Sequence, residues 1–447
     1  MVDCPAQQCP GRTAPTGGEP RVTAVHHTVG RTGAGADAAT ARAAYEQLRA
    51  RGLKLDLTRG KPSPEQLDLS DALLTILKPG DVRSADGTDC RNYGGLQGLA
   101  ELRAVFAELL DVPADQLFAC GNASLSVMHD VVAHAMLAVL PGAKQRWADE
   151  DEVRFLCPVP GYDRHFTICD RFGITMVPVP LTGEGPDMDV VEELVASDPR
   201  IKGMWCVPKY SNPTGETYSD ETVRRLAAMP AAAPDFRLFW DNAYAVHHLT
   251  EERTPLLPIL AACEAAGHPD RAFLFASTSK ITVAGAGVAF LGSSPANMAW
   301  YARLAAAQTI GPDKVNQLRH ARFFTDAAAV ETHMDGHRQL LEPRFAAVYD
   351  VLERELGPLG IATWTRPLGG YFVSLEVPEG CASEVVRLAK EAGIALTPAG
   401  AAFPGGKDPR DSQIRLAPSF PSVDEVRSAM EGVAVCVRLA AAERAAA

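Results

Sequence analysis

Five short apolar runs alternate with helical patterns through the middle of this 447-residue chain. The runs are EVRFLCPVP, ITMVPVPL, KGMWCVP, FRLFWDN and RAFLFAS. Continuous apolar runs of this length are typical of strands buried on both faces, and intervening helices favour parallel pairing. The sequence therefore predicts an α/β fold with a mainly parallel central sheet.

Composition limits the classes of protein that such a sheet could serve. A chain of this length with 47% hydrophobic residues can form a large domain and a smaller one. The 43 basic and 55 acidic residues give a net charge of −12, which argues against a general nucleic-acid surface but permits local anion sites. Function must therefore come from a site.

Cysteine usage and the chain start indicate the compartment. The ten cysteines show neither the spacing of a zinc site nor a disulfide framework, so we expect buried thiols and no bound metal. Neither a signal-peptide pattern nor a membrane-length apolar run of about eighteen residues occurs. We expect a cytoplasmic protein that does not contact membranes.

The N-terminal region precedes the first expected strand. Residues 1–37 are rich in Gly, Pro, Thr and Ala and are expected to form a flexible tail. The stretch DAATARAAYEQLRARG predicts a helix ending at Gly52, and LKLDLTRGKPSPEQLDLS, broken by two prolines, predicts an extended segment.

Polar residues follow three of the apolar runs, where ligands collect in parallel sheets. Asn212 follows the third run, Asp241 and Tyr244 follow the fourth, and Lys280 follows the fifth. The separations allow helical crossovers back to the same sheet edge. An amide, a carboxylate, a phenol and an amine are thus expected to converge, although Lys280 alone could be an ordinary solvated lysine.

This set of side chains matches the needs of pyridoxal phosphate. Lys280 would form the Schiff base and move the substrate proton, and Asp241 would pair with the pyridinium nitrogen. Asn212 and Tyr244 would hydrogen-bond the ring oxygen.

A phosphate site is predicted in FACGNASLSVMHDVVAHAML, where a short apolar strand leads into a helical pattern. Asn122, Ala123 and Ser124 stand at the expected helix N-terminus, which favours anions. The same tripeptide could be only a helix cap, and its reading as a glycosylation sequon does not suit a cytoplasmic chain.

Seven motifs in order, NYGGLQG, GNAS, PGYDRH, SNPTG, DNAY, STSK and QIRLAPS, resemble the fold type I, class I/II aminotransferases. RGKPSPEQLDLS, RNYGGLQG and STSKITVAGAGVAF resemble more narrowly the bacterial aspartate aminotransferases of subgroup Ic. The resemblance runs from about residue 40 to the C-terminus.

The resemblance implies a homodimer with active sites at the subunit interface, and a small domain made from both chain ends. It implies an N-terminal segment of residues 38–88, a large cofactor domain of 89–325 and a C-terminal small domain of 326–447. It assigns the ring contacts given above and adds Tyr162 stacking on the ring, although Tyr162 could be a core residue. Tyr93 would reach the phosphate of the neighbouring subunit.

Substrate and phosphate contacts are also implied. Arg415 matches the arginine that binds the substrate α-carboxylate, for which a guanidinium offers a bidentate fork. The alternative is an ordinary surface arginine. Gly60 resembles the flexible glycine segment that closes over the substrate.

One position departs from the family. Many relatives carry a phosphate-binding arginine seven or eight residues beyond the lysine, where this chain has Gly287 and Val288. The phosphate would then rely on Ser277, Ser279, the Asn122–Ser124 amides and Tyr93. A basic residue from elsewhere could assist.

The implied reaction is amino transfer from L-aspartate to 2-oxoglutarate by a ping-pong mechanism. Kynurenine, 2-aminoadipate or an aromatic amino acid could instead be the donor, and the scaffold also supports β-lyase, racemase and decarboxylase chemistry. A transcriptional regulator would need a winged-helix domain ahead of the body, for which only the tail offers room. For the distal carboxylate we consider Lys314 or Arg319 of a neighbouring chain, or Lys61 beside Gly60, against the alternative of a solvated basic helix end.

Overall fold

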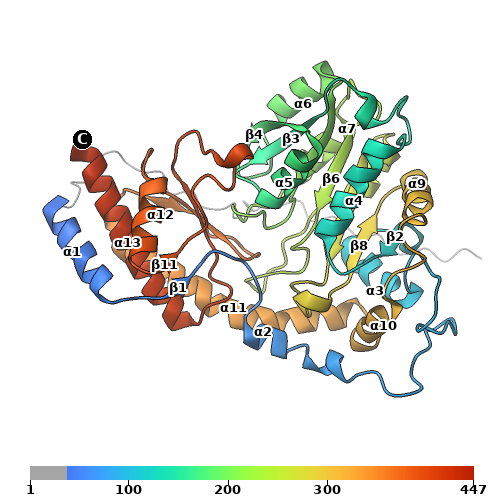
Figure 1. Ribbon diagram of the computed structural model, residues 1–447, viewed down its shortest axis with the longest axis horizontal. Helices are drawn as coiled ribbons and strands as arrows, with labels where there is room; N and C mark the ends of the chain where they lie inside the picture. Colours follow the sequence, from blue (N-terminus) through green and yellow to red (C-terminus); the bar gives the residue numbers. More distant parts are fainter. Residues whose placement is uncertain (1–37, 447) are drawn as a thin grey trace, which may run out of the picture.

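The five apolar runs form strands of one seven-stranded sheet in a computed structural model that describes residues 38–446 (Figure 1). The expected N-terminal tail lies outside the described residues. The strand order is β2-β8-β7-β6-β5-β3-β4. The strands are β2 (Leu117–Ala119), β3 (Arg154–Val159), β4 (Thr175–Pro180), β5 (Ile201–Cys206), β6 (Arg237–Asp241), β7 (Ala272–Ser277) and β8 (Ala289–Gly292).

The pairing confirms the expected α/β fold with a mainly parallel sheet. Strands β7, β6, β5, β3 and β4 are parallel to their neighbours in that series. β8 pairs antiparallel with both β7 and β2. All three polar strand ends therefore meet at one edge of the sheet, because they belong to the parallel strands β5, β6 and β7.

Alternate residues of the central strands lie on opposite faces of the sheet and are buried under two different layers of helices. In β6, Leu238 and Trp240 pack into one core, and Phe239 packs into the other. The first layer comprises α3 (Ala100–Leu110), α6 (Met188–Ser197), α7 (Asp220–Ala228), α8 (Ile259–Ala265) and α10 (Lys314–Phe323). The second comprises α4 (Ser124–Leu137), α5 (Asp163–Phe172) and α9 (Pro295–Ala305). The sheet is thus covered on both faces, as its apolar strands require.

A third hydrophobic core combines helices and strands from the two ends of the described chain. Figure 1 shows α1 beside α13 at the end far from the large sheet. This core contains α1 (Ala38–Ala50), α12 (Ala382–Glu391), α13 (Val423–Ala446), the antiparallel sheet β12-β10-β9 and the parallel pair β1-β11. These strands are β1 (Leu55–Asp56), β9 (Thr363–Trp364), β10 (Val373–Glu376), β11 (Ile394–Ala395) and β12 (Gln413–Leu416). The helix expected to end at Gly52 is α1, and Gly52 has a positive φ of 61°.

Helix α11 (Ala327–Glu355) connects this core to the large sheet. Its first turns bury Val330 and Met334 in the core under the sheet, whereas Leu341 and Phe345 pack with the chain ends. Short 3-10 helices occupy Asp71–Leu74, Ala114–Gln116, Trp147–Asp149, Pro269–Arg271, Ala284–Ala286, Gly357–Leu359 and Pro404–Gly406.

One stretch that the sequence predicted as extended contains a helix, α2 (Pro64–Asp68). Pro64 occupies its first position, where the missing N–H costs nothing. The Gln66 side chain accepts a hydrogen bond from the Ser63 backbone N–H at 3.1 Å. This local capping outweighs the two prolines that suggested a continuous extended segment.

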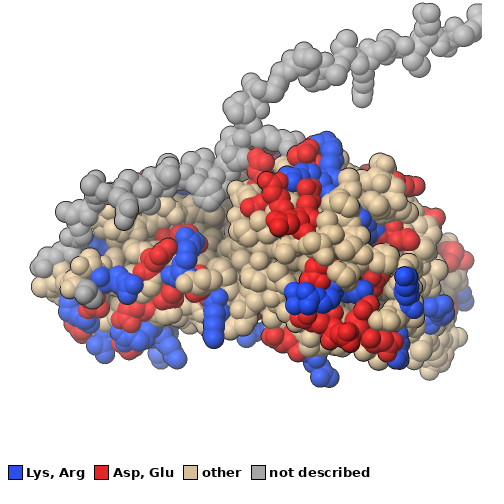
Figure 2. Space-filling model, turned by 90° about the horizontal axis from the view of Figure 1, so that it is seen from above, with Lys and Arg blue, Asp and Glu red and all other residues tan. Residues whose placement is uncertain are grey.

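The surface and the thiols agree with the composition. Lys and Arg side chains lie among Asp and Glu side chains on the face shown in Figure 2, rather than in one basic patch. Of the eight cysteines in the described residues, Cys120 is half-buried and the others are buried as free thiols. Among residues 38–446, each helix is too short or too polar to cross a membrane.

Candidate active site

Lys280 lies three residues beyond the end of β7, at the carboxyl edge of the sheet. Its Nζ is 5.0 Å from the centroid of the Tyr244 ring. Burial lowers the pKa of the Lys280 amine, and the nearby Asp241 carboxylate partly offsets this effect. The neutral amine that nucleophilic attack requires is therefore more accessible here than on a solvated lysine.

Asp241 is the last residue of β6. One of its carboxylate oxygens is hydrogen-bonded and the other is left open. Its Oδ2 lies 3.0 Å from Nε2 of His165, and both side chains are buried. The imidazole of His165 stacks on Trp205 with ring centroids 4.3 Å apart, which fixes its plane. The other oxygen, Oδ1, is buried without a hydrogen-bond partner among residues 38–446. Because a buried carboxylate oxygen is costly when unpaired, this oxygen marks a place for a donor from a ligand.

Sequence reasoning missed His165, although PGYDRH was one of the quoted motifs. It lies one helical turn after Tyr162, and the two rings are 5.0 Å apart. Helical spacing from the proposed stacking tyrosine was the available signal.

Two tyrosines border the same space. Tyr162 precedes the first residue of α5, and burial, with a contribution from Asp241, raises the pKa of its phenol to about 12. Burial also raises the pKa of Tyr244 well above its ordinary value. Both phenols thus stay protonated at neutral pH and can act as hydrogen-bond donors.

Arg415 reaches the residues at the sheet edge from β12 of the small sheet. Its Nη1 donates to Oδ1 of Asp163 at 2.9 Å and to Oδ1 of Asn212 at 3.4 Å. Its guanidinium lies 5.2 Å from the centroid of the Phe372 ring, and its Nε is buried without a partner among the described residues. This guanidinium still has free N–H donors and can bind a carboxylate.

Gly60 lies against the same aromatic ring. A Cβ added at Gly60 would stand 2.5 Å from the Phe372 ring, so a larger residue would displace the ring that supports Arg415. The structure thus brings Gly60 and Arg415 against the same Phe372 ring.

The predicted phosphate site lies where the N-terminus of α4 meets the segment after β7. Ser124 is the first residue of α4, preceded by Asn122 and Ala123. Ser279 Oγ donates to the Asn122 carbonyl at 3.2 Å, and the Ser279 N–H points to Ser277 Oγ at 3.5 Å. We call Asn122–Ser124, Ser277 and Ser279 the cradle. Amides at a helix N-terminus and two hydroxyls can bind an anion there.

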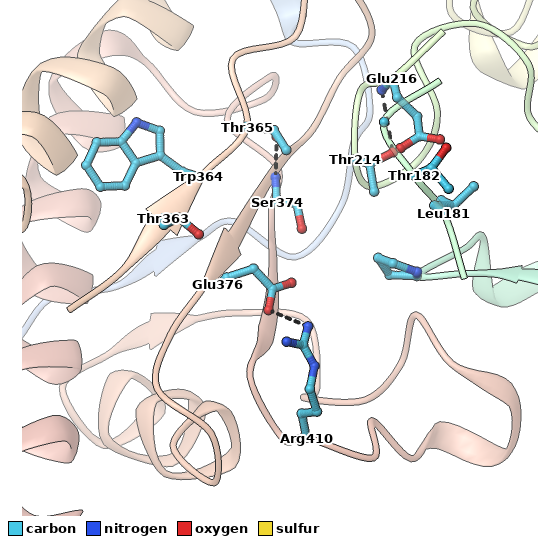
Figure 3. Close-up of a pocket in the computed structure, with 12 residues that line it drawn as sticks. Leu181, Thr182, Thr214, Glu216, Thr363, Trp364, Thr365, Ser374, Glu376 and Arg410 are labelled. Atoms are coloured by element: carbon cyan, nitrogen blue, oxygen red, sulfur yellow. Dashed lines mark hydrogen bonds and ion pairs between the residues drawn. The ribbon is translucent and has the colours of Figure 1, made fainter. Parts of the chain in front are cut away.

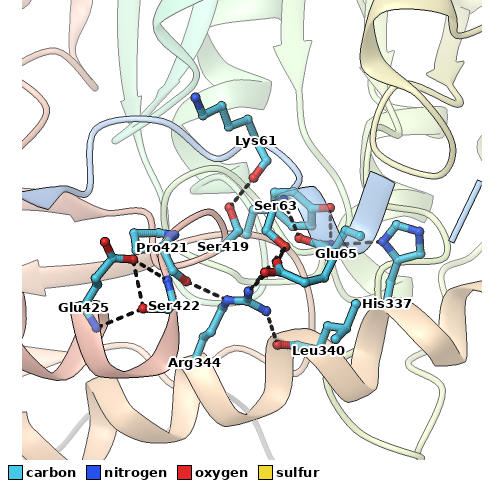
Figure 4. A network of polar contacts seen from close by, with 12 residues as sticks. Lys61, Ser63, Glu65, His337, Leu340, Arg344, Ser419, Pro421, Ser422 and Glu425 are labelled. Atoms are coloured by element: carbon cyan, nitrogen blue, oxygen red, sulfur yellow. Dashed lines mark hydrogen bonds and ion pairs between the residues drawn. The ribbon is translucent and has the colours of Figure 1, made fainter. Parts of the chain in front are cut away.

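Tyr93 and Lys61 do not contact these groups within the chain. Tyr93 is 82% exposed. Figure 4 shows the Lys61 side chain pointing away from the polar network that its backbone joins through Ser419. Its ammonium lies 3.8 Å from the centroid of the Phe420 ring.

The other two candidates for a distal carboxylate lie on α10. The ammonium of Lys314 is buried and donates to the carbonyls of Asn92 and Gly94, at 2.8 and 2.5 Å. Arg319 is half-buried. Lys314 is therefore committed to the backbone beside Tyr93.

A cavity of about 310 Å³ lies beside the Arg415 strand (Figure 3). Its small-sheet side includes Ser374, the register partner of Arg415, and the ion pair between Glu376 and Arg410. Thr214 and Glu216, from the loop after β5, line the opposite side. Burial raises the pKa of Glu216 to about 8.

Together these residues fit pyridoxal phosphate. Asp241 Oδ1 would receive a protonated ring nitrogen, the cradle would receive a phosphate, and Lys280, which directly follows Ser279 of the cradle, offers an amine near Asp241. Arg415 would hold a substrate carboxylate next to this space.

Three comparisons with known proteins agree in class. The family model described as aspartate amino-transferase matches residues 32–447. A Mycolicibacterium smegmatis protein, provisionally named an aminotransferase, is 59% identical over 403 residues, which cover 89% of this chain and 94% of that protein. An aspartate aminotransferase of Corynebacterium glutamicum is 53% identical over 399 residues, which cover 89% of this chain and 92% of that protein. The crystal structure of an aspartate transaminase from C. glutamicum superposes with a TM-score of 0.90 at 52% identity, covering 91% of this chain and 96% of that one.

Proposed function

This chain belongs to the aspartate amino-transferase family of fold type I enzymes, and we propose that it transfers the amino group of L-aspartate to 2-oxoglutarate with pyridoxal 5′-phosphate as cofactor. The products would be oxaloacetate and L-glutamate, formed in two half-reactions of a ping-pong cycle. That the chain is an aminotransferase follows from the family. The substrates and the cofactor of this chain are the proposal.

The observation that carries the proposal is the open oxygen of Asp241, a carboxylate close enough to act on Lys280 and Tyr244, with Arg415 reaching the same residues through Asn212. When bound, the cofactor withdraws electrons from the substrate and so weakens its Cα–H bond. Asp241, oriented by His165, would keep the ring nitrogen protonated. Asn212 and Tyr244 would hold the ring oxygen.

Lys280 would carry the proton that leaves Cα. Burial lowers the pKa of its amine, so the free amine that accepts a proton forms more readily than on a solvated lysine. Arg415 would fix the α-carboxylate and thereby hold Cα within reach of this amine. Tyr162 would cover the ring, and the closing segment at Gly60 would exclude water from the pocket.

The aspartate preference is supported by the relative of C. glutamicum, which is named an aspartate aminotransferase. A second cation must then meet the side-chain carboxylate. Lys61 and Arg319 are the candidates whose charged groups have no hydrogen bond to a backbone carbonyl within residues 38–446.

We also propose a homodimer with shared active sites. Tyr93 and Ile310 are 82% and 63% exposed, and both lie where Gly311 approaches the Gly94 carbonyl. Large apolar side chains exposed together favour an interface, and a second copy is the partner that would use Tyr93 at its cradle. A cytoplasmic location stays a prediction from the sequence.

A screen of single half-reactions tests the substrate. The holoenzyme is mixed with one amino acid at a time, without an acceptor, and the cofactor spectrum is followed by stopped flow. L-aspartate and L-glutamate should react fastest and yield one equivalent of the corresponding 2-oxo acid. Faster reaction with kynurenine, 2-aminoadipate or an aromatic amino acid would show that this compound, and not aspartate, is the amino donor. Formation of pyruvate and ammonia from a β-substituted amino acid would identify a lyase.

A further inference from the structure

Helix α10 buries a row of polar side chains beside the cradle. Lys314, Asn316, Gln317 and His320 are all buried, with exposures of 9% or less. Burying four polar side chains on a helix of ten residues is unfavourable unless each is hydrogen-bonded. All four are bonded, and their partners are the segments that surround the cradle.

Gln317 holds the segment that leads into α4. Its Nε2 donates to the carbonyls of Ala119 and Cys120, at 2.9 and 3.2 Å. Its Oε1 accepts the Leu99 N–H at 2.8 Å. The end of β2, three residues before Asn122, is therefore fixed to α10.

Asn316 holds the opposite wall of the cradle. Its Nδ2 donates to the carbonyls of Ala286 and Gly287, at 2.9 and 3.1 Å. A Cβ added at Gly287 would lie 3.2 Å from both the Asn122 carbonyl and Ser279 Oγ. Asn316 thus fixes the backbone that stands directly against two cradle residues.

Lys314 holds the loop that carries Tyr93. Its ammonium donates to the carbonyls on either side of Tyr93, those of Asn92 and Gly94. The exposed tyrosine therefore projects from a loop whose backbone is fixed. The distal-carboxylate role that the sequence suggested for Lys314 of a neighbouring chain stays a prediction.

His320 holds the turn that contains Ser279 and Lys280. Its Nε2 lies 3.3 Å from Thr278 Oγ1 and 2.9 Å from Thr282 Oγ1. Its Nδ1 lies 2.9 Å from the Asn316 carbonyl on the same helix. These contacts tie the segment after β7 to the same support.

We propose that the buried polar face of α10 is the positioning frame of the phosphate cradle: it holds the β2–α4 segment, the turn at Lys280, the backbone at Gly287 and the Tyr93 loop in the geometry that binds phosphate. Backbone amides and hydroxyls bind an anion tightly only when they are held in place beforehand. Residues 287 and 288 are Gly and Val, so neither supplies a cation to the cradle. The frame compensates for this missing cation by fixing the neutral hydrogen-bond donors of the cradle. The inference rests on the cofactor proposed above.

The test compares two ligands that differ only in the phosphate. The full-length apoenzyme is titrated with pyridoxal 5′-phosphate and with pyridoxal. Asn316→Ala and Lys314→Met should raise the dissociation constant for pyridoxal 5′-phosphate about tenfold or more, and leave that for pyridoxal within about twofold. Lys314→Arg, which retains donors, should restore affinity.

Arg322→Met is the matched control, because Arg322 is on the same helix but donates to the Arg83 carbonyl and Asp81, away from the cradle. It should change neither constant. Thr282→Val removes one hydroxyl from His320 with little change of shape, and should weaken pyridoxal 5′-phosphate alone by about threefold. If the other variants fail to fold, the two dissociation constants of Thr282→Val test the inference on their own.

Equal weakening of both ligands would overturn the inference, because a merely structural role of α10 would not distinguish them. Unchanged affinity for pyridoxal 5′-phosphate in the folded variants would also overturn it. A wild-type chain that binds neither ligand would instead refute the proposed cofactor, and so is distinguishable from failure of the frame.

Discussion

Replacing Arg415 with lysine tests how the substrate carboxylate is bound. In the structure Nη1 is engaged by Asp163 and Asn212, which leaves Nε and Nη2 for a carboxylate. A lysine keeps the charge, but its single ammonium would meet Asp163 first and cannot form the bidentate pair. The loss of about two charge-assisted hydrogen bonds, partly offset by the retained charge, amounts to about 2 to 3 kcal/mol in the transition state.

The expected result is a fall in kcat/KM of about 30- to 150-fold. The fall should be similar for aspartate, glutamate and alanine, and for their 2-oxo acids, because all of them carry the α-carboxylate. Steady-state kinetics in both directions measure it. Arg410→Lys is the control, since Arg410 pairs with Glu376 at the exposed rim of the neighbouring cavity, and it should stay within about twofold of wild type. A loss confined to aspartate and glutamate would refute the reasoning, because Arg415 would then bind the side-chain carboxylate.

Three further predictions follow from the same geometry. Asp241→Ala should slow the half-reaction with aspartate by on the order of 10³-fold, because the ring nitrogen loses the partner that keeps it protonated; an unchanged rate in stopped flow would contradict this role. Wild type should lose stability between pH 4.5 and about 8, because Glu216 ionises in the unfolded chain over this range while burial keeps it protonated in the folded protein. Glu216→Gln, which keeps an acceptor for the Gly185 N–H, should abolish that loss and gain on the order of 4 kcal/mol over wild type at pH 9; parallel pH profiles of melting temperature would refute it. Lys61→Ala or Arg319→Ala should impair aspartate and glutamate at least tenfold more than alanine; equal losses for all three donors in both variants would exclude this account of specificity.

The sequence predicted the central sheet because its strands are buried on both faces and stand out as apolar runs. It did not identify β8 as a strand, since Ala289–Gly292 follows a segment rich in Gly and Ala. It took the segment of α2 as extended, because the prolines concealed a capped helix.

Some residues of the candidate site could likewise be predicted from the sequence, and others could not. The polar residues that end strands could be located because parallel topology brings those ends together. Contacts between residues far apart in sequence could not: Asp241 and His165 are 76 residues apart, and Lys314 and Asn92 are 222 apart. The sequence shows that such side chains exist, but only the packing of helices on the sheet decides which polar groups must satisfy one another.

We propose that the cofactor binds covalently to Lys280, and the whole mechanism depends on this bond. The most direct measurement is borohydride reduction of the holoenzyme followed by proteolysis and mass spectrometry of the peptides. We predict one phosphopyridoxyl group per chain, on the lysine of the peptide that contains STSKITV. A modification on any other lysine, or none in a preparation that transaminates, would show that Lys280 does not hold the cofactor.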